Sequence, residues 1–292
     1  MKVKVAETAG FCFGVKRAVD KVYELIDTEQ KPIFTLGPII HNEGVVADLE
    51  ARGVHVIAEA DLDSPDDILQ SGTVVIRSHG VGKPIYDKLK EKNISYVDVT
   101  CPFVLKIHRI VEKESLAGNH VVIIGDKDHP EVQGICGWCQ GPYTVIKNQE
   151  EAEAFVPPKG KKISIVSQTT FNYNKFKDLV EILCKKRYDN NVLNILNILN
   201  TICNATEERQ REAKNIAGEV DTMLVVGGRH SSNTQKLFEI CKKECGNTYY
   251  IQTPVDLDSE MFQCSSFVGI TAGASTPKKI IEEVQEHVRI KF

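Results

Sequence analysis

The sequence predicts an α/β fold made of three similar units with mostly parallel sheets. Short β-branched runs alternate with amphipathic stretches from end to end, which is the pattern of strand–helix–strand units. Three times, a short apolar run ends in a lone cysteine that a helix-like stretch follows at once. In such units, functional groups gather in the loops after the carboxyl ends of strands. The same pattern therefore predicts the architecture and the place of the site.

Strand and helix signals follow one another in order. The N-terminal MKVKV and six later runs have strand character, and six stretches between them repeat apolar residues at i, i+3 and i+4. Pro102, Pro277 and Asn204 or Thr206 are typical of helix starts. The strands are expected at 74–78, 96–99, 121–125, 163–167, 223–228 and 267–271, and the helices at 15–26, 84–92, 103–114, 173–186, 234–244 and 277–288.

No long linker divides the chain, so the repeat itself sets the expected boundaries. It predicts a first unit at 1–96, a second at 97–197 and a third at 198–292. The run NNVLNILNILN at 190–200 repeats a tripeptide and is interpreted as a strand with a local duplication. It has no functional explanation.

Composition excludes several classes of protein. The 292 residues carry a net charge of −4, whereas a nucleic-acid surface is normally basic. No apolar run approaches the ~20 residues of a membrane helix, and the N-terminus lacks the apolar core of a signal peptide. We therefore expect a cytoplasmic protein. Its nine cysteines are an odd number and should be reduced, metal-bound or catalytic.

The chemistry-bearing residues form a three-by-three array. A polar turn follows each lone cysteine after 28 or 29 residues, and a second polar turn comes 38 to 44 residues later. The array predicts three thiolates and six turns around one centre. The cysteines are Cys12, Cys101 and Cys203; the first turns carry His41 with Asn42, His129 with Glu131, and Ser231 with Ser232 and Asn233; the second turns carry His79, Thr169 and Ser275.

Three cysteines near helix N-termini suit an iron–sulfur cluster, because the helix dipole favours thiolates and a structural zinc site normally needs four ligands. With no fourth cysteine at the same offset, a cubane cluster would leave one iron open. The remaining cysteines are expected to be structural. Cys184, Cys241, Cys245 and Cys264 have no ligand-like neighbours. Cys136 and Cys139 form CGWC, which resembles a redox dithiol or half of a zinc site, but a zinc site would need two more ligands at matching spacing and CGWC opens no clear helix.

The polar turns predict an anion site. Serine and asparagine before a helix are ordinarily N-caps, but several helix starts that converge would bind an anion. Only Arg77 and Arg229 lie near these turns, so neutral donors, helix ends and protonated histidines would have to hold the anion. The other five histidines are expected to be structural. Glu131 is interpreted as a general acid, with stabilisation of a helix start as its alternative role.

The ordered motifs GFCFGVKRAV, GPIIHN, RSHG, VTCPFV, HPEV, SQTT, NTICNAT, SSN and GAS resemble the LytB/IspH family, from about residue 9 to 277. The resemblance implies 4-hydroxy-3-methylbut-2-enyl diphosphate reductase activity, the last step of the methylerythritol-phosphate route, yielding isopentenyl and dimethylallyl diphosphate. It implies three α/β units in pseudo-threefold arrangement around a [4Fe–4S] cluster with one open iron. Cys12, Cys101 and Cys203 would be its ligands, and Glu131 would donate protons with Thr169 as relay.

The electrons must come from outside the chain, because no GxGxxG fingerprint follows a strand and no second cluster motif is present. A ferredoxin or flavodoxin is the expected donor. Two alternatives stay open: a non-redox iron–sulfur hydro-lyase acting on a phosphorylated alcohol, and a redox or iron-sensing module without activity. An additional RNA-binding-like domain, present in some family members, is not expected.

Overall fold

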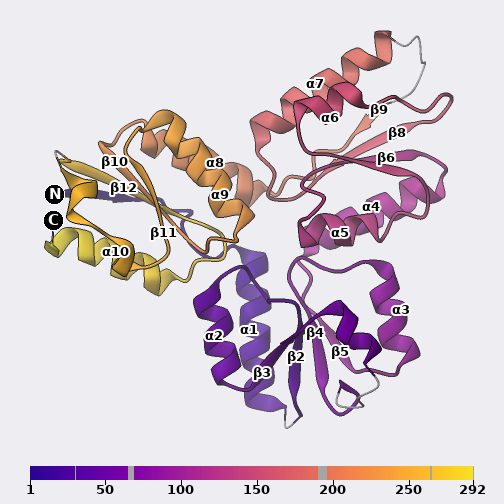
Figure 1. Ribbon diagram of the computed structural model, residues 1–292, viewed down its shortest axis with the longest axis horizontal. Helices are drawn as coiled ribbons and strands as arrows, with labels where there is room; N and C mark the ends of the chain where they lie inside the picture. The colour runs from indigo at the N-terminus through magenta and orange to yellow at the C-terminus, as the bar shows by residue number, and fades with distance from the viewer. Residues whose placement is uncertain (30, 65–68, 190–195, 264, 292) are drawn as a thin grey trace. The chain divides into compact units, whose positions relative to one another are not determined.

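The computed structural model describes residues 1–29, 31–64, 69–189, 196–263 and 265–291. Their strands form three four-stranded sheets, and every pairing among them is parallel (Figure 1). The predicted α/β class with parallel sheets is therefore confirmed. The strands are β1 (Lys2–Val5), β2 (Ile33–Leu36), β3 (Val54–Ile57), β4 (Thr73–Ile76), β5 (Tyr96–Asp98), β6 (His120–Ile124), β7 (Tyr143–Ile146), β8 (Ile163–Ser167), β9 (Leu196–Ile198), β10 (Thr222–Val226), β11 (Thr248–Ile251) and β12 (Phe267–Ala272).

Helices connect these strands. The expected helices are all present, among them α8, which begins at Asn204 directly after Cys203, and the structure adds three shorter ones at α2, α5 and α6. The helices are α1 (Phe13–Thr28), α2 (Glu43–Ala51), α3 (Lys83–Glu91), α4 (Pro102–Leu116), α5 (Pro130–Cys136), α6 (Gln149–Ala154), α7 (Tyr173–Asp189), α8 (Asn204–Ala217), α9 (Ser232–Glu244) and α10 (Lys278–Lys291), with 3₁₀ turns at η1 (Glu59–Asp63), η3 (Pro254–Asp256) and η4 (Ser259–Phe262).

The sheets have one strand order in common. Their orders are β3-β2-β4-β5, β7-β6-β8-β9 and, with the N-terminal strand at its edge, β11-β10-β12-β1. By main-chain contacts the chain divides into two compact units. The first, unit 1, comprises 1–19, 40–51 and 204–292; the second, unit 2, comprises 20–39 and 52–203.

The central strands are Val- and Ile-rich because helices cover both of their faces. All residues of β6 and β10 are buried, for example. Helices α8 and α9 pack on one face of the β10–β12 sheet, where Ala213 and Leu237 contact Val225. Helix α10 covers the other face through Ile281 and Val284. Both faces can be followed in Figure 1.

Sheet membership differs from the sequential division that the repeat suggested. Strand β1 does not pair within the predicted first unit at 1–96 but with β12, where Lys2 lies opposite Phe267. Cys101 and Cys203 thus follow edge strands that complete the sheet of the two turns before them, and Cys12 follows the edge strand of the last sheet, whereas the sequence grouped each cysteine with the two turns that come next in the chain. The predicted boundaries at 96 and 197 fall at β5 and within β9, and they stay predictions about domains. In the 190–200 run, 196–198 form β9 and 190–195 lie outside the described residues.

Helix α4 carries a buried histidine that packs on an aromatic ring. The ring of His108 is 1% exposed and stacks on Trp138 with 5.2 Å between the centroids. Neither ring nitrogen has a hydrogen-bond partner among the described residues. Burial lowers the pKa of His108 to about 4, against a smaller opposing effect of Asp98. This histidine is therefore neutral in the folded chain, as expected for a structural role.

Acid should destabilise the fold through His108. Because its pKa is about 4 in the folded state and near 6.5 in the unfolded chain, only the unfolded chain takes up this proton between those values. The free energy of unfolding should fall by about 3 kcal/mol as the pH drops from 6.5 to 4 through this group alone. Denaturant unfolding of His108→Phe should lack that part of the slope. His55→Phe, at an exposed position, should keep it; an unchanged slope in His108→Phe would contradict this explanation.

Candidate functional site

The strand order brings the sequence motifs to the carboxyl edge of each sheet. The two central strands of a sheet lead into the two polar turns, and one edge strand leads into a cysteine. The cysteines follow β5, β9 and β1; the first polar turns follow β2, β6 and β10; the second polar turns follow β4, β8 and β12. The three-by-three array in the sequence is thus an array of strand ends.

A main-chain hydrogen bond ties each cysteine to the polar turn on the neighbouring strand. In each case the cysteine N–H donates to a carbonyl at or next to the turn's functional residue. The three bonds run from Cys101 to Ser78 (3.0 Å), from Cys203 to Thr169 (3.0 Å) and from Cys12 to Ala274 (3.3 Å). The first two pairs lie within unit 2 and the third within unit 1.

Each of these cysteines also stands at the start of a helix. Cys101 is the N-cap of α4, and Pro102 is the first residue of that helix. Helices α1 and α8 begin one residue after Cys12 and Cys203. None of the three cysteines forms a disulfide, and all three are half-buried. Soft donors at helix N-termini suit the anionic thiolate form that a metal cluster requires. The donor set therefore fits an iron–sulfur group.

The other cysteines have the properties of structural residues. Cys241 is fully buried, and burial raises the pKa of its thiol to about 12. In CGWC, Cys136 is the last residue of α5, so the helix dipole opposes its thiolate. Burial raises the pKa of Cys136 and brings that of Cys139 to about 12, the opposite of what a reactive dithiol needs. Cys264 lies outside the described residues.

A buried carboxyl group lies at the centre of unit 2. Glu131 is 1% exposed, in the first turn of α5, and its N–H donates to Nδ1 of the N-cap His129 (3.1 Å). Oε1 of its carboxyl group accepts the N–H of Thr169 (2.6 Å), and Oε2 contacts the Thr169 hydroxyl at 2.7 Å. Since Cys203 donates to the Thr169 carbonyl, acid, threonine and cysteine form one connected path.

Unit 2 also brings two of the predicted histidines together. The rings of His79 and His129 meet edge to face with 5.5 Å between centroids. The His79 turn lies on α5, where a Cβ on Gly137 would come within 2.6 Å of the Gly82 Cα. The Trp138 indole N–H donates to the Val81 carbonyl at 2.9 Å and fixes the same turn.

Unit 1 gathers serine and asparagine side chains. Ser231 is the N-cap of α9, as expected of a serine there, and its Oγ accepts the N–H of Thr234 (3.3 Å). The Ser275 hydroxyl lies 3.4 Å from Ser231 Oγ and donates to the His41 carbonyl at 3.0 Å. Gly228 lets the His41 loop approach, because a Cβ there would lie 2.7 Å from that carbonyl.

Asn233 is a buried amide at the start of α9. It is 5% exposed, and neither side-chain oxygen nor nitrogen has a hydrogen-bond partner among the described residues. Leaving such a group unpaired costs about 1–3 kcal/mol. Asn233 stands in the first turn of α9, where main-chain N–H groups can bind an anion, so its place fits the predicted anion site.

Comparison with known proteins agrees with these features. The protein-family model described as "LytB protein" matches residues 3–289. This chain belongs to the LytB family. A relative from Alkaliphilus oremlandii is 47% identical over 99% of both chains, and one from Caldanaerobacter subterraneus subsp. tengcongensis is 46% identical over 99% of this chain and 97% of the relative. Both carry the name 4-hydroxy-3-methylbut-2-enyl diphosphate reductase.

Solved structures of the LytB family also match. A structure of (E)-4-hydroxy-3-methyl-but-2-enyl diphosphate reductase, described as the terminal enzyme of the non-mevalonate pathway, gives a TM-score of 0.69 at 38% identity over 99% of both chains. The corresponding reductase from Plasmodium falciparum gives 0.88 at 27% identity, over 99% of this chain and 87% of the other. No helix of the described residues has the length and apolarity to cross a membrane.

Two buried arginines contact the protein scaffold. The sequence placed the first, Arg77, near the polar turns, and it gave no role to the second, Arg209. Arg77, one of the two cations nearest the turns, is largely buried, and its Nη2 pairs with Glu59 at 3.6 Å. Arg209 was missed, although it is 3% exposed and binds main-chain carbonyls. The helical spacing in the sequence could have indicated its burial, because Arg209 lies on the apolar face of α8 together with Ala213 and Ile216.

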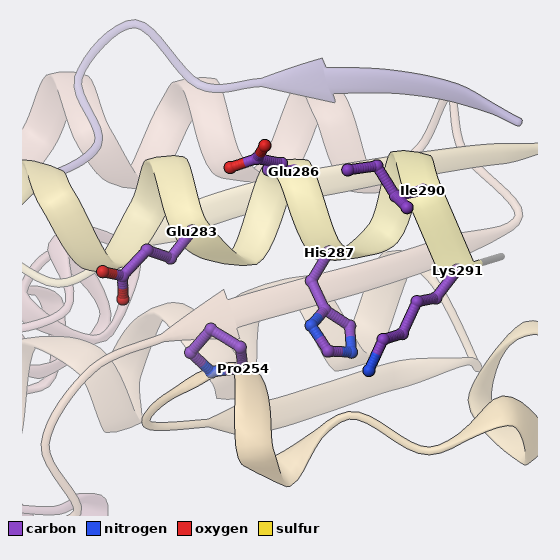
Figure 2. A pocket seen from close by; sticks show the side chains of 6 residues that line it. All are labelled: Pro254, Glu283, Glu286, His287, Ile290 and Lys291. Carbon is purple, nitrogen blue, oxygen red and sulfur yellow. The ribbon is translucent and has the colours of Figure 1, made fainter.

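One hollow in the surface lies away from the predicted site residues. Figure 2 shows it beside α10 and η3, with a volume of about 340 Å³. None of the predicted LytB site residues lines it. Its walls are Pro254, Glu283, Glu286, His287, Ile290 and Lys291.

Adding one methyl group at Gly137 should destabilise unit 2. The alanine Cβ would meet the Gly82 main chain at 2.6 Å, and backbone cannot move aside as a flexible side chain can. Overpacking of this kind costs about 1–3 kcal/mol. Chemical denaturation of Gly137→Ala should show that loss. Gly218→Ala, whose Cβ would meet nothing closer than 3.6 Å, should unfold like the parent; equal stability of the two variants would show that the contact is not tight.

Proposed function

We propose that this chain reduces 4-hydroxy-3-methylbut-2-enyl diphosphate to isopentenyl and dimethylallyl diphosphate, the last step of the methylerythritol-phosphate route. Its relatives in the LytB family carry that reductase name over their full length. The observation that carries the proposal is the buried Glu131–Thr169 pair, because loss of a hydroxyl group as water needs a proton donor away from solvent. The unpaired Asn233 adds a place for the diphosphate.

Cys12, Cys101 and Cys203 are proposed to hold a [4Fe–4S] cluster with one iron open to substrate. The support is their repeated placement, each at a helix start and each tied to a polar turn. When bound, the cluster supplies the two electrons one at a time and a Lewis-acid position for the hydroxyl group. The electrons enter from a ferredoxin or flavodoxin. The arrangement of the three sheets around such a cluster stays a prediction.

Glu131 supplies the proton for the leaving hydroxyl group. In its protonated form it donates from Oε2 through the Thr169 hydroxyl, 2.7 Å away, which passes its own proton on. The carboxylate that remains keeps the Thr169 N–H at 2.6 Å on its other oxygen, so its charge is stabilised as it forms. A second proton is needed at the allylic carbon. The full reaction consumes two electrons and two protons and releases water.

The diphosphate is held without a cluster of lysines or arginines. Asn233 and the free N–H groups of the first turn of α9 offer neutral donors, and Ser231 and Ser275 lie next to them. Ser232 contacts Lys236 at 2.8 Å on the same turn. His41, His79 and His129 are proposed to add positive charge when protonated.

Glu131→Gln should abolish most turnover and little else. The amide keeps the size of the side chain but cannot donate a proton and return to a stable anion, so kcat should fall at least about 100-fold. Product formation is measured anaerobically with a chemical one-electron reductant, beside the cluster spectrum with and without substrate. Glu153→Gln, an exposed carboxyl group, is the matched control.

Three outcomes would decide between the candidates. Near-normal turnover of Glu131→Gln would refute its role. Product formed without any reductant would make the wild type a hydro-lyase instead. A cluster spectrum that allylic diphosphates leave unchanged, with no turnover, would favour a sensing module.

Diphosphate affinity should weaken as the pH rises through the histidine range. A histidine that gains an anionic partner binds it best when protonated, and this charge is lost above its pKa. Binding of dimethylallyl diphosphate should therefore be about tenfold or more tighter at pH 6 than at pH 9. The His41→Gln, His79→Gln and His129→Gln variants should each flatten the curve. Constant affinity from pH 6 to 9 would exclude histidine from the diphosphate site.

A further inference from the structure

An arginine is buried under the loop that carries Cys12. Arg209 on α8 is 3% exposed, and its two terminal nitrogens donate to two main-chain carbonyls, that of Ala272 at 2.7 Å and that of Gly10 at 2.9 Å. Burying a guanidinium group costs several kcal/mol unless its N–H groups are satisfied. Its planar fork is therefore fixed by both carbonyls at once, which a lysine cannot reproduce.

Both carbonyls belong to segments that lead into site residues. Gly10 stands two residues before Cys12 and has φ +101°, a conformation that favours glycine. Ala272 ends β12, three residues before Ser275. The Cys12 N–H bonds the Ala274 carbonyl between them, so the arginine closes a ring that contains the cysteine loop and the serine turn.

One turn further along α8, a carboxylate holds the start of the same loop. Glu212 accepts the N–H groups of Glu7 at 2.7 Å and Thr8 at 2.9 Å, and also the Thr8 hydroxyl. Arg209 and Glu212 are three residues apart and so lie on one face of the helix. Residues 7–10 are thus fixed at both ends by side chains of a single helix.

We propose that Arg209, supported by Glu212, is a positioning residue that fixes the Cys12 loop against the Ser275 turn. It rests on the proposed function only in taking Cys12 as a cluster ligand. The helix that carries the pair begins directly after Cys203, so one rigid element follows one cluster cysteine in the chain and clamps the loop of another. Loss of the fork should free the Cys12 loop while the rest of unit 1 keeps its packing.

The test compares Arg209→Lys and Arg209→Met with Arg211→Met, an exposed arginine on the same helix. In the full-length chain without cluster, alkylation of each cysteine by iodoacetamide is followed by peptide mass spectrometry. Cys12 should react about tenfold faster in Arg209→Met and at an intermediate rate in Arg209→Lys. Glu212→Gln, which turns one acceptor oxygen into a donor, should also accelerate Cys12. Arg211→Met should leave the rate unchanged.

Other cysteines serve as internal controls. Cys101 and Cys203 belong to unit 2 and should keep their rates, and Cys241, fully buried in unit 1, reports any loosening of that unit. Equal acceleration of Cys12 and Cys241 would mean general unfolding and would overturn the proposal. So would a wild-type rate at Cys12 in both Arg209 variants. If Arg209→Met does not fold, the lysine variant still decides.

A second measurement uses the chain with its cluster reconstituted anaerobically. Iron release to a chelator should be about tenfold faster in Arg209→Met than in the wild type, with Arg211→Met as control. The two proposals fail separately. A wild type that takes up no iron would defeat the proposed function while the alkylation result still stands for the loop, whereas normal Cys12 reactivity in a working reductase would defeat only the role of Arg209.

Discussion

The site depends on one repeated main-chain hydrogen bond, from the N–H of each lone cysteine to the turn at the end of the neighbouring strand. Parallel pairing makes this bond possible, because neighbouring strands end at the same edge of the sheet. The cysteine is then held by its own main chain, and none of the three forms a disulfide. The same bond ties each cysteine to a polar turn, so the proposed metal donors and the proposed substrate-binding groups are placed by the sheet and not by long side chains.

The second feature is the way charge is used. Two of the arginines serve the scaffold: Arg77 pairs with Glu59, and Arg209 binds main-chain carbonyls. In the proposed site, the anion is bound by helix starts and by the buried amide of Asn233. Neutral donors that are already in place need little reorganisation as an anion arrives.

Much of this could be predicted from the sequence, because strands, helix starts and motif turns are local signals. The cysteines, Glu131 and the polar turns were found from spacing and residue type alone. Spacing does not report pairing over long distances, however. Nothing in KVKV says that β1 joins β12, and nothing in HPEV says that the carboxyl group of Glu131 meets Thr169, 38 residues on. Arg209 was missed because an arginine in a charged helix gives no sign of burial unless its apolar face is traced.

The pairing of β1 with β12 gives a physical reason for the proposed clamp on the Cys12 loop. Lys2 and Phe267 are separated by 265 residues, whereas β2 and β4 pair across 40. By loop-closure entropy the longer connection costs about 2 kcal/mol more. Strand β1 has four residues to offset this, with Val3 and Val5 packed on the α10 side of the sheet. The contacts of Arg209 and Glu212 add four hydrogen bonds to the main chain of the same two segments, at about 1 kcal/mol or more each. The buried ion on α8 therefore compensates for a cost that the chain order imposes on this sheet alone.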